Sequence, residues 1–474
     1  MYPADQRRNP RTDNRSLLAK STRQTSNLVG SLISATQQFS TMTTPYSAST
    51  VSTGAINQQK RPPLPTMLLT EYKDSDEINK STRVIEPNLN ITVNKYVFKK
   101  QNLEPDEGKP IETVEDTYLK SLKEHQLRIK NLEEKCSAHT LENAVYSGKA
   151  RPRYFRSRMY NIAYCKVPKC GSTFWTRLFT VLDNGIEEAK EFMKLSRAAI
   201  HSRRHTFNDY VRNVIQLQSP SILSSRNPYS RLFSAFIDKS YLPLMYEINY
   251  AIKGKSSKIR GKSTCPGRVT FQDFLHWIVR SARRGMSLNR HWAPIFTLCK
   301  PCKVKPLAIL HQETFAQDVD FITKYMSVEK EKYDFIRNTL QGHRDEVSLP
   351  SIIGTILERA ETPSRLRCLG GWDGVMRRVW NSLVIQGFIS VNAEYPSGVF
   401  AAMNDPSDGH EASEIILSVI AKHPMTSEEK HTQRNEALKA AYAKVDDKTI
   451  NAIKQLYRED FELFGYSNVP PHLV

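Results

Sequence analysis

Residues 159–182, MYNIAYCKVPKCGSTFWTRLFTVL, decide the fold of this chain. The mostly apolar run at 162–167 is typical of a buried β-strand, and Pro168 and Gly171 end that run. From Phe174 onward the apolar residues recur at helical spacing. The stretch therefore predicts a strand, a tight loop and a helix.

The predicted loop has the chemistry of an anion site. Ser172 and Thr173 can cap the helix, and the amides at its N-terminus attract phosphate or sulfate. Lys169 adds a mobile positive charge inside the turn. The loop is not a Walker A motif, which needs Gly, four residues and then Gly-Lys-Ser/Thr, because here the lysine precedes a single glycine. A different anionic donor is therefore expected.

A second candidate site lies in residues 219–238, SPSILSSRNPYSRLFSAFID. The pattern predicts a strand ending near Ser225, a turn at residues 227–228 and then an amphipathic helix. Arg226 stands at the end of the strand, and Ser234 follows about two helical turns later. A guanidinium and a hydroxyl at this spacing can converge on one phosphate.

Together the two motifs resemble the 5′-phosphosulfate loop and the 3′-phosphate site of sulfotransferases that use 3′-phosphoadenylyl sulfate (PAPS). The resemblance implies PAPS as donor, with Lys169 at the bridging oxygen of its phosphosulfate and Arg226 and Ser234 on its 3′-phosphate. The implied donor contacts are Pro168, Lys169, Cys170, Gly171, Ser172, Thr173, Phe174, Arg226 and Ser234.

Further landmarks are similar to those of the Golgi carbohydrate sulfotransferases, including the chondroitin and dermatan 4-O-sulfotransferases and the HNK-1 epitope enzyme. They are Arg-His-Trp at 290–292, Leu-Cys-Lys-Pro-Cys at 298–302, Glu-Thr at 313–314 and the C-terminal helix at 456–466. The resemblance runs from about residue 130 to 345 and from about 436 to 467. It implies a Golgi-lumenal enzyme and an acidic glycan or glycosaminoglycan acceptor.

The resemblance also implies an α/β fold, a P-loop-type parallel sheet with helices on both faces. Residues 1–66 are rich in Ser, Thr, Gln and Asn and are expected to be disordered, and residues 67–111 are expected to form a tether. The sulfotransferase domain is predicted at 112–474, opening with an exposed amphipathic helix and holding a divergent insert at about 346–435.

The net charge indicates that the protein binds a polyanionic partner. The chain carries 68 lysines and arginines against 49 acidic residues, a formal charge of +19. Its basic clusters flank the predicted site and lack a recognised nucleic-acid-binding fold, which favours a donor and an acidic glycan over nucleic acid. No apolar run approaches the ~20 residues of a membrane span, and no signal-peptide core is visible. The membrane anchor usual in the family is thus not visible in this sequence.

Seven cysteines include a Cys-x-x-Cys pair, Cys299 and Cys302. A zinc site would need two further ligands at ordered spacing, and Lys300-Pro301 does not suggest the start of a redox helix. We therefore expect Cys299 and Cys302 to form structural disulfides, and we expect no metal. Cys165, within the predicted strand, is interpreted as plain core.

Three rival functions remain at this stage. A nucleotide kinase would share the strand, loop and helix, but it would need a Walker A loop and a Mg²⁺ carboxylate. A basic nucleic-acid-binding module explains the charge but not the pairing of Arg226 with Ser234. A catalytically inactive glycan-binding relative explains both features, and only activity separates it from an enzyme.

The general base is predicted to be His201, which lies between the two donor motifs where a family histidine falls at a similar point. Its rivals are His205 and His291; the neighbour of the latter, Trp292, suggests sugar stacking or core packing. We expect His201→Ala to lower sulfuryl transfer ~10² to 10⁴-fold and to remove the acidic limb of the pH–rate profile. Affinity for adenosine 3′,5′-bisphosphate should persist. The same signature in His291→Ala alone would move the base to the later segment.

Overall fold

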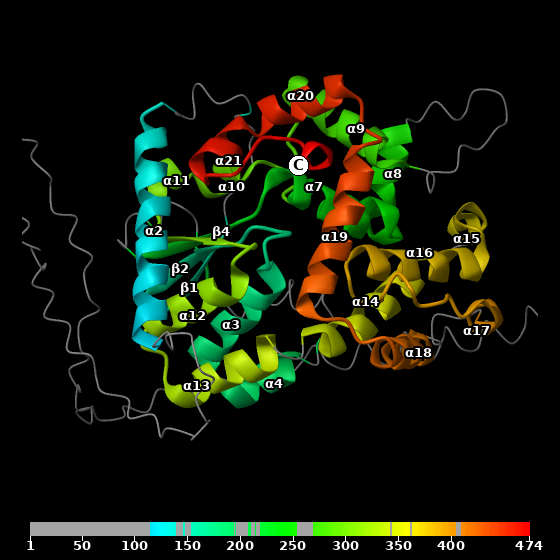
Figure 1. Cartoon of the computed structure of the whole chain (residues 1–474), viewed down its shortest axis with the longest axis horizontal. Coiled ribbons are helices and arrows are strands. Elements are labelled where there is room, and N and C mark those ends of the chain that lie inside the picture. Colours follow the sequence, from blue (N-terminus) through cyan, green and yellow to red (C-terminus); the bar gives the residue numbers. More distant parts are fainter. Residues whose placement is uncertain are drawn as a thin grey trace, which may run out of the picture. The chain divides into compact units, whose positions relative to one another are not determined.

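The computed structural model of the protein describes residues 114–138, 146, 153–193, 195, 207–209, 214, 219–253, 269–341, 344–360, 363–403 and 409–474. The predicted disordered segment at 1–66 and the predicted tether at 67–111 lie outside these residues. Figure 1 shows the described elements as ribbons.

The described strands form one mixed sheet in the order β3-β1-β2-β4-β5. The strands are β1 (Tyr154–Ser157), β2 (Ile162–Cys165), β3 (Phe207–Asp209), β4 (Ser221–Ser225) and β5 (Ala308–His311). Strands β2, β4 and β5 are parallel, but β1 is antiparallel to both β2 and β3. The expected parallel sheet is thus found in β2, β4 and β5, and β1 and β3 make the whole sheet mixed. Only a short turn joins β1 to β2, and a turn of that length permits an antiparallel pair alone.

Helices cover both faces of the sheet, as expected for the α/β class. Side chains alternate along a strand, so Ile162 and Tyr164 of β2 enter one hydrophobic cluster while Ala163 and Cys165 enter another. The first cluster includes residues of α3 (Ser172–Asn184) and α12 (Phe315–Tyr325). The second includes residues of α7 (Pro228–Phe236), α9 (Phe271–Arg283), α10 (Ile295–Cys299), α20 (Asp447–Leu456) and α21 (Arg458–Leu463).

A further group of helices surrounds a third hydrophobic cluster. Helix α19 contacts both this group, through α16, and the sheet-covering helix α7 (Figure 1). The predicted insert at 346–435 falls on these helices. The group consists of α14 (Arg344–Ala360), α15 (Pro363–Leu369), α16 (Gly371–Ile385), α17 (Ser397–Ala402) and α18 (Gly409–Lys422), whereas α19 (Ser427–Tyr442) contributes Tyr442 to the second cluster.

Apart from α2 (Val114–Cys136), the remaining described helices have at most eight residues each. They are α4 (Ile186–Met193), the π-helix η1 (Ile237–Tyr241), η2 (Pro243–Met245), α8 (Tyr246–Lys253), α11 (Pro301–Val304), α13 (Lys330–Phe335), η5 (Ile336–Gln341) and η7 (Pro471–Leu473). Within the described ranges, no helix combines the length and apolar character that a membrane crossing requires.

Helix α2 (Val114–Cys136) is more deeply integrated than the sequence predicts. Instead of lying exposed, it packs against β5 and α12, with His125 and Leu132 buried (Figure 1). The Arg128 guanidinium donates to the Asp318 carboxylate at 2.9 Å and to the Ile309 carbonyl at 2.9 Å. Helix α2 is therefore part of the core of the domain.

Two disulfides between described residues hold the sheet and its flanking helices together. Cys136 of α2 pairs with Cys302, and Cys165 of β2 pairs with Cys299. The interpretation of Cys165 as plain core is wrong, because its side chain points to the sheet face where α10 ends at Cys299. Both cysteines of the Cys-x-x-Cys pair are structural, as predicted.

Asp318 anchors α2 to the end of β5. Burial alone would raise the pKa of Asp318, but the hydrogen bond from His125 and the charge of Arg128 outweigh burial and lower that pKa below its ordinary value. The carboxylate also accepts a hydrogen bond from the His311 amide at 2.6 Å. The ionised form is therefore the one that the fold stabilises.

We expect Asp318→Asn to lower the free energy of unfolding by about 3–5 kcal/mol at neutral pH, because it removes the buried counter-ion of Arg128 and leaves only the exposed Glu124 at 3.5 Å. Since folding lowers the pKa of Asp318, this contribution is present above the ordinary aspartate value of about 4 and is lost as pH falls below it. Urea titrations at pH 7 and at acidic pH measure the difference. Asp334→Asn, which removes an exposed ion pair with Lys330, is the control and should cost less than about 1 kcal/mol. Equal losses in both variants would contradict the anchoring role.

Candidate active site

Three loops meet at the carboxyl edge of the parallel strands, where ligands bind in open α/β sheets. Within the loop after β2, residues 168–171 are called the phosphate loop below. The Ser224 hydroxyl at the end of β4 donates to the Cys170 carbonyl of that loop at 2.9 Å. The Asn227 amide after β4 donates to the Glu313 carboxylate after β5 at 3.0 Å. Hydrogen bonds thus join all three loops.

The phosphate loop turns through left-handed backbone at Lys169 (φ 70°) and Gly171 (φ 73°). A Cβ atom at Gly171 would lie 3.0 Å from the Phe315 ring and 3.1 Å from the Gln312 amide, so only glycine fits here. Helix α3 begins directly afterwards, with Gly171 as its N-cap and no side-chain capping bond. The expectation that Ser172 or Thr173 caps this helix is therefore wrong. Its first turn keeps the geometry of an anion-binding N-terminus.

Lys169 is anchored rather than mobile. Its ammonium lies 2.8 Å from the Asp238 carboxylate, and both side chains are less than one-tenth exposed. Lys239 shares the same carboxylate oxygen at 3.2 Å. Asp238 was missed by the sequence reasoning, although it follows Ser234 by four residues and so falls on the same helical face. It belongs to the π-helical turn η1, a distortion frequent at functional sites.

Arg226 reaches the phosphate loop, as its place after β4 suggests. Its guanidinium donates to the Lys169 carbonyl at 3.2 Å. Ser234 lies half-buried on α7, one turn before Asp238. Asn227 caps α7 by accepting from the Tyr229 amide at 2.9 Å, and Pro228 occupies the first helical position. Arg226, which was predicted to bind the 3′-phosphate, therefore lies beside the loop that was predicted to bind the 5′-phosphosulfate.

The carboxylate of Glu313, at an exposed position, holds the turn that carries Arg226. Glu313 accepts from the Asn227 amide with one oxygen and from the Tyr466 hydroxyl, at 3.0 Å, with the other. The Ser225 hydroxyl lies 3.0 Å from the same Tyr466 oxygen. Burial raises the pKa of Tyr466 well above its ordinary value, so this hydroxyl stays protonated and can donate. The Glu-Thr and C-terminal landmarks therefore meet at the site.

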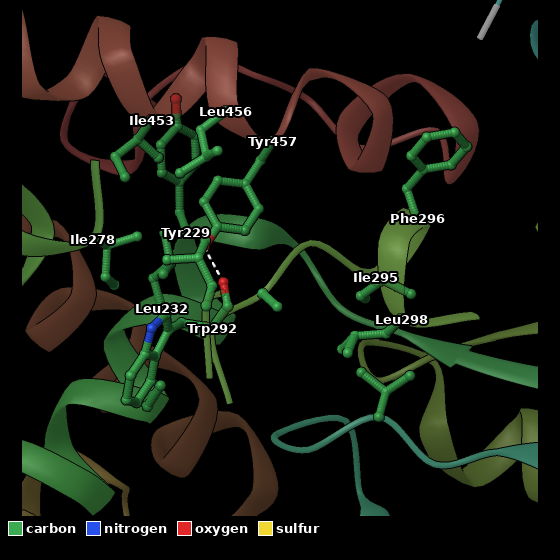
Figure 2. Close-up of a cluster of buried hydrophobic side chains, with 14 of the residues drawn as sticks. Tyr229, Leu232, Ile278, Trp292, Ile295, Phe296, Leu298, Ile453, Leu456 and Tyr457 are labelled. Carbon is green, nitrogen blue, oxygen red and sulfur yellow. Dashed lines mark hydrogen bonds between the residues drawn. The ribbon is translucent and has the colours of Figure 1, made fainter. Parts of the chain in front are cut away.

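Arg231 links the phosphate loop to the Arg-His-Trp segment. Its guanidinium is buried and donates to the carbonyls of Pro168 at 3.2 Å, Ala293 at 2.7 Å and Arg290 at 2.9 Å. Trp292, next in this segment, has no exposed surface and packs edge-on against Phe274. Core packing is therefore its role, and sugar stacking is not. Figure 2 shows Trp292 within the cluster, with the Tyr457 hydroxyl bonded to its carbonyl.

The candidate bases differ in what the structure shows of them. His201 and His205 lie outside the described residues. His291 is half-buried, and its Nδ1 lies 2.7 Å from the Asn289 side-chain oxygen. Cys170 is a buried free thiol, and burial raises its pKa to about 12, so it is not a nucleophile at neutral pH. The assignment of the base to His201 stays a prediction.

The geometry places the open N-terminus of α3, an anion-binding type of helix end, at the carboxyl edge of the parallel strands of a mixed α/β sheet. The pattern of the Sulfotransferase family matches residues 152–361 and 414–467, and the chain belongs to that family. No solved structure matches the protein.

Curated relatives are carbohydrate sulfotransferases. Carbohydrate sulfotransferase 10 of Xenopus laevis is 28% identical over 232 residues, which are 43% of this chain and 62% of the relative. Carbohydrate sulfotransferase 9 of Homo sapiens is 27% identical over 199 residues, 38% of this chain and 42% of the relative. Carbohydrate sulfotransferase 8 of Mus musculus is 24% identical over 232 residues, 45% of this chain and 49% of the relative. The chain thus spans less than two thirds of each relative's length.

We expect Arg231→Lys to lower the free energy of unfolding by about 3 kcal/mol or more, because an ammonium cannot replace a fork that serves three buried carbonyls. Urea titration measures the loss. Arg337→Lys is the matched control, since Arg337 is about half exposed and pairs with Asp320. It should cost less than about 1 kcal/mol. A mild effect of Arg231→Lys, equal to the control, would show that Arg231 does not hold the two loops together.

Proposed function

We propose that this protein transfers a sulfuryl group from PAPS to a hydroxyl of a glycan. Membership of the sulfotransferase family supports the reaction class, and the names of its relatives support a carbohydrate acceptor. The observation that carries the proposal is the hydrogen bond from the Arg226 guanidinium to the Lys169 carbonyl. That bond sets the cation assigned to the 3′-phosphate beside the loop assigned to the 5′-phosphosulfate.

In this proposal the acceptor oxygen attacks sulfur while the bond from sulfur to the bridging oxygen breaks. Lys169 neutralises the charge that develops on the leaving oxygen, and the first turn of α3 binds the 5′-phosphate. Arg226 and Ser234 bind the 3′-phosphate, and His201 accepts the proton of the acceptor hydroxyl. An ammonium has three hydrogen-bond donors, of which the Asp238 carboxylate accepts one from Lys169.

The acceptor and the compartment follow from charge and redox chemistry. A net charge of +19 favours an acidic glycan, such as a glycosaminoglycan, over a neutral one. The two disulfides are typical of an oxidising compartment, which supports the Golgi lumen. We assign the sulfotransferase domain to 112–474 with a divergent insert at about 346–435. The break in the family match between 361 and 414 falls within that insert.

Binding of nucleotides tests the proposal. Adenosine 3′,5′-bisphosphate should bind much more tightly than ATP. We expect Arg226→Ala to lower the affinity for the bisphosphate ~30-fold, which corresponds to about 2 kcal/mol for a lost charge-assisted pair. The affinity for 5′-AMP should be nearly unchanged. Arg337→Ala removes an equal charge at an exposed ion pair and should change neither affinity. Isothermal titration calorimetry measures all three ligands.

The outcomes separate the alternatives. A preference for ATP would indicate a kinase-like protein and would overturn the proposal. An equal loss of affinity for the bisphosphate and for 5′-AMP in Arg226→Ala would show that Arg226 does not bind the 3′-phosphate. Tight bisphosphate binding without transfer to any glycan would identify a catalytically inactive glycan-binding relative.

A further inference from the structure

Three basic residues gather at one corner of the sheet, beside the phosphate loop. Arg153 precedes β1, Lys166 follows β2, and Arg290 comes from the segment between α9 and α10. The Lys166 amide donates to the Arg153 carbonyl at 2.9 Å, and the Arg290 guanidinium donates to the Lys166 carbonyl at 2.9 Å. Backbone contacts therefore fix all three residues at this place, which is called the basic corner below.

The basic corner has no counter-ion among the described residues. Lys166 is only 8% exposed, and its ammonium lies 4.6 Å from the centre of the Phe155 ring. Burial, and then the charges of Arg290 and Arg153, lower the pKa of Lys166 to about 8. Burial and the charge of Arg153 likewise lower the pKa of Arg290 to about 10. Lys166 is buried and Arg290 is partly buried, whereas Arg153 is exposed, and like charges held this close together are unfavourable unless an anion joins them.

Unsatisfied hydrogen-bond donors lie at the same corner. The Nε of Arg290 and the hydroxyl of Tyr164 are buried, and neither has a hydrogen-bond partner in the described part of the chain. Tyr164 of β2 and Lys166, just after that strand, both lie beside Phe155, whose ring centre is 6.3 Å from that of Tyr164 and 4.6 Å from the Lys166 ammonium. Arg290 is close enough for its charge to act on the Tyr164 hydroxyl. A group that only accepts hydrogen bonds would satisfy these atoms.

The basic corner lies on the opposite side of β2 from the site assigned to the 3′-phosphate. Strand β2 has β4 on one side, leading to Arg226, and β1 on the other, preceded by Arg153. Lys166 is nevertheless only three residues from Lys169, at most about 11 Å along the backbone. An acceptor whose hydroxyl reaches the donor sulfur near Lys169 can therefore place a neighbouring substituent at this corner.

We propose that Arg153, Lys166 and Arg290 form a subsite for an anionic substituent of the acceptor glycan, a carboxylate or a sulfate. This inference rests on the proposed function. It makes the basic corner a determinant of acceptor specificity, separate from the residues that bind the donor.

Calorimetry on the bisphosphate-saturated protein tests the subsite with three chondroitin-type tetrasaccharides. One is unsulfated with free carboxylates, one is unsulfated and carboxyl-reduced, and one is carboxyl-reduced and 4-O-sulfated. We expect at least one anionic form to bind ~10-fold more tightly than the neutral form, the effect of one charge-assisted hydrogen bond. The form that shows this preference identifies the substituent as carboxylate or sulfate.

Lys166→Met keeps an apolar stem over Phe155 while removing the charge, and it should abolish the preference without changing bisphosphate affinity. Arg153→Gln, at an exposed position, should reduce the preference without a risk to folding. Lys332→Met is the matched control, because Lys332 also lies over an aromatic ring, that of Tyr160 at 5.6 Å, but pairs with Glu329. The control should retain the full preference.

Three results would overturn the subsite: no anion preference in the wild type, an unchanged preference in both corner variants, or a parallel loss of bisphosphate affinity in Lys166→Met. The last result would assign the corner to the donor. Failure of the proposed function would give a different result, which is weak binding of the bisphosphate by the wild type before any saccharide is added.

Discussion

The site depends on one buried cation, the guanidinium of Arg231. It joins the Pro168 carbonyl of the phosphate loop to the carbonyls of Arg290 and Ala293, and it is almost fully excluded from solvent. A planar fork can serve carbonyls from two loops at fixed angles, whereas an ammonium on a flexible stem cannot. Arg231 therefore ties the phosphate loop to the segment carrying Arg290 and His291.

The C-terminal helices complete that arrangement from a distant part of the sequence. Asp460 accepts from the amides of Ile295 and Phe296, at 2.7 and 2.8 Å, and so fixes the start of α10. Burial raises the pKa of Asp460 to about 6, although the charge of Arg231 and these two bonds oppose the rise. Tyr457 of the same region bonds to the Trp292 carbonyl (Figure 2). The two matched stretches of the family pattern therefore build one core.

Helix α2 shows that the domain extends beyond the family match, which begins at residue 152. A disulfide from Cys136 to Cys302 and the ion pair between Arg128 and Asp318 attach α2 to the end of β5. That strand leads to Glu313, which holds the turn carrying Arg226. Contacts made before the matched region thus reach the site through one strand, and the conformation of the donor loops depends on them.

The sequence by itself determined the elements whose signals are local. It predicted β2, the phosphate loop and α3, and likewise β4 and the turn before α7. These elements could be predicted because their signals, apolar periodicity and the breakers Pro168, Gly171 and Pro228, depend only on residues that are neighbours in the sequence. Tertiary structure alone decided the antiparallel β1, the disulfide of Cys165, the pairing of Lys169 with Asp238, and the basic corner around Lys166. Each of these joins elements whose proximity follows from how the sheet and helices pack, and no local pattern specifies that packing.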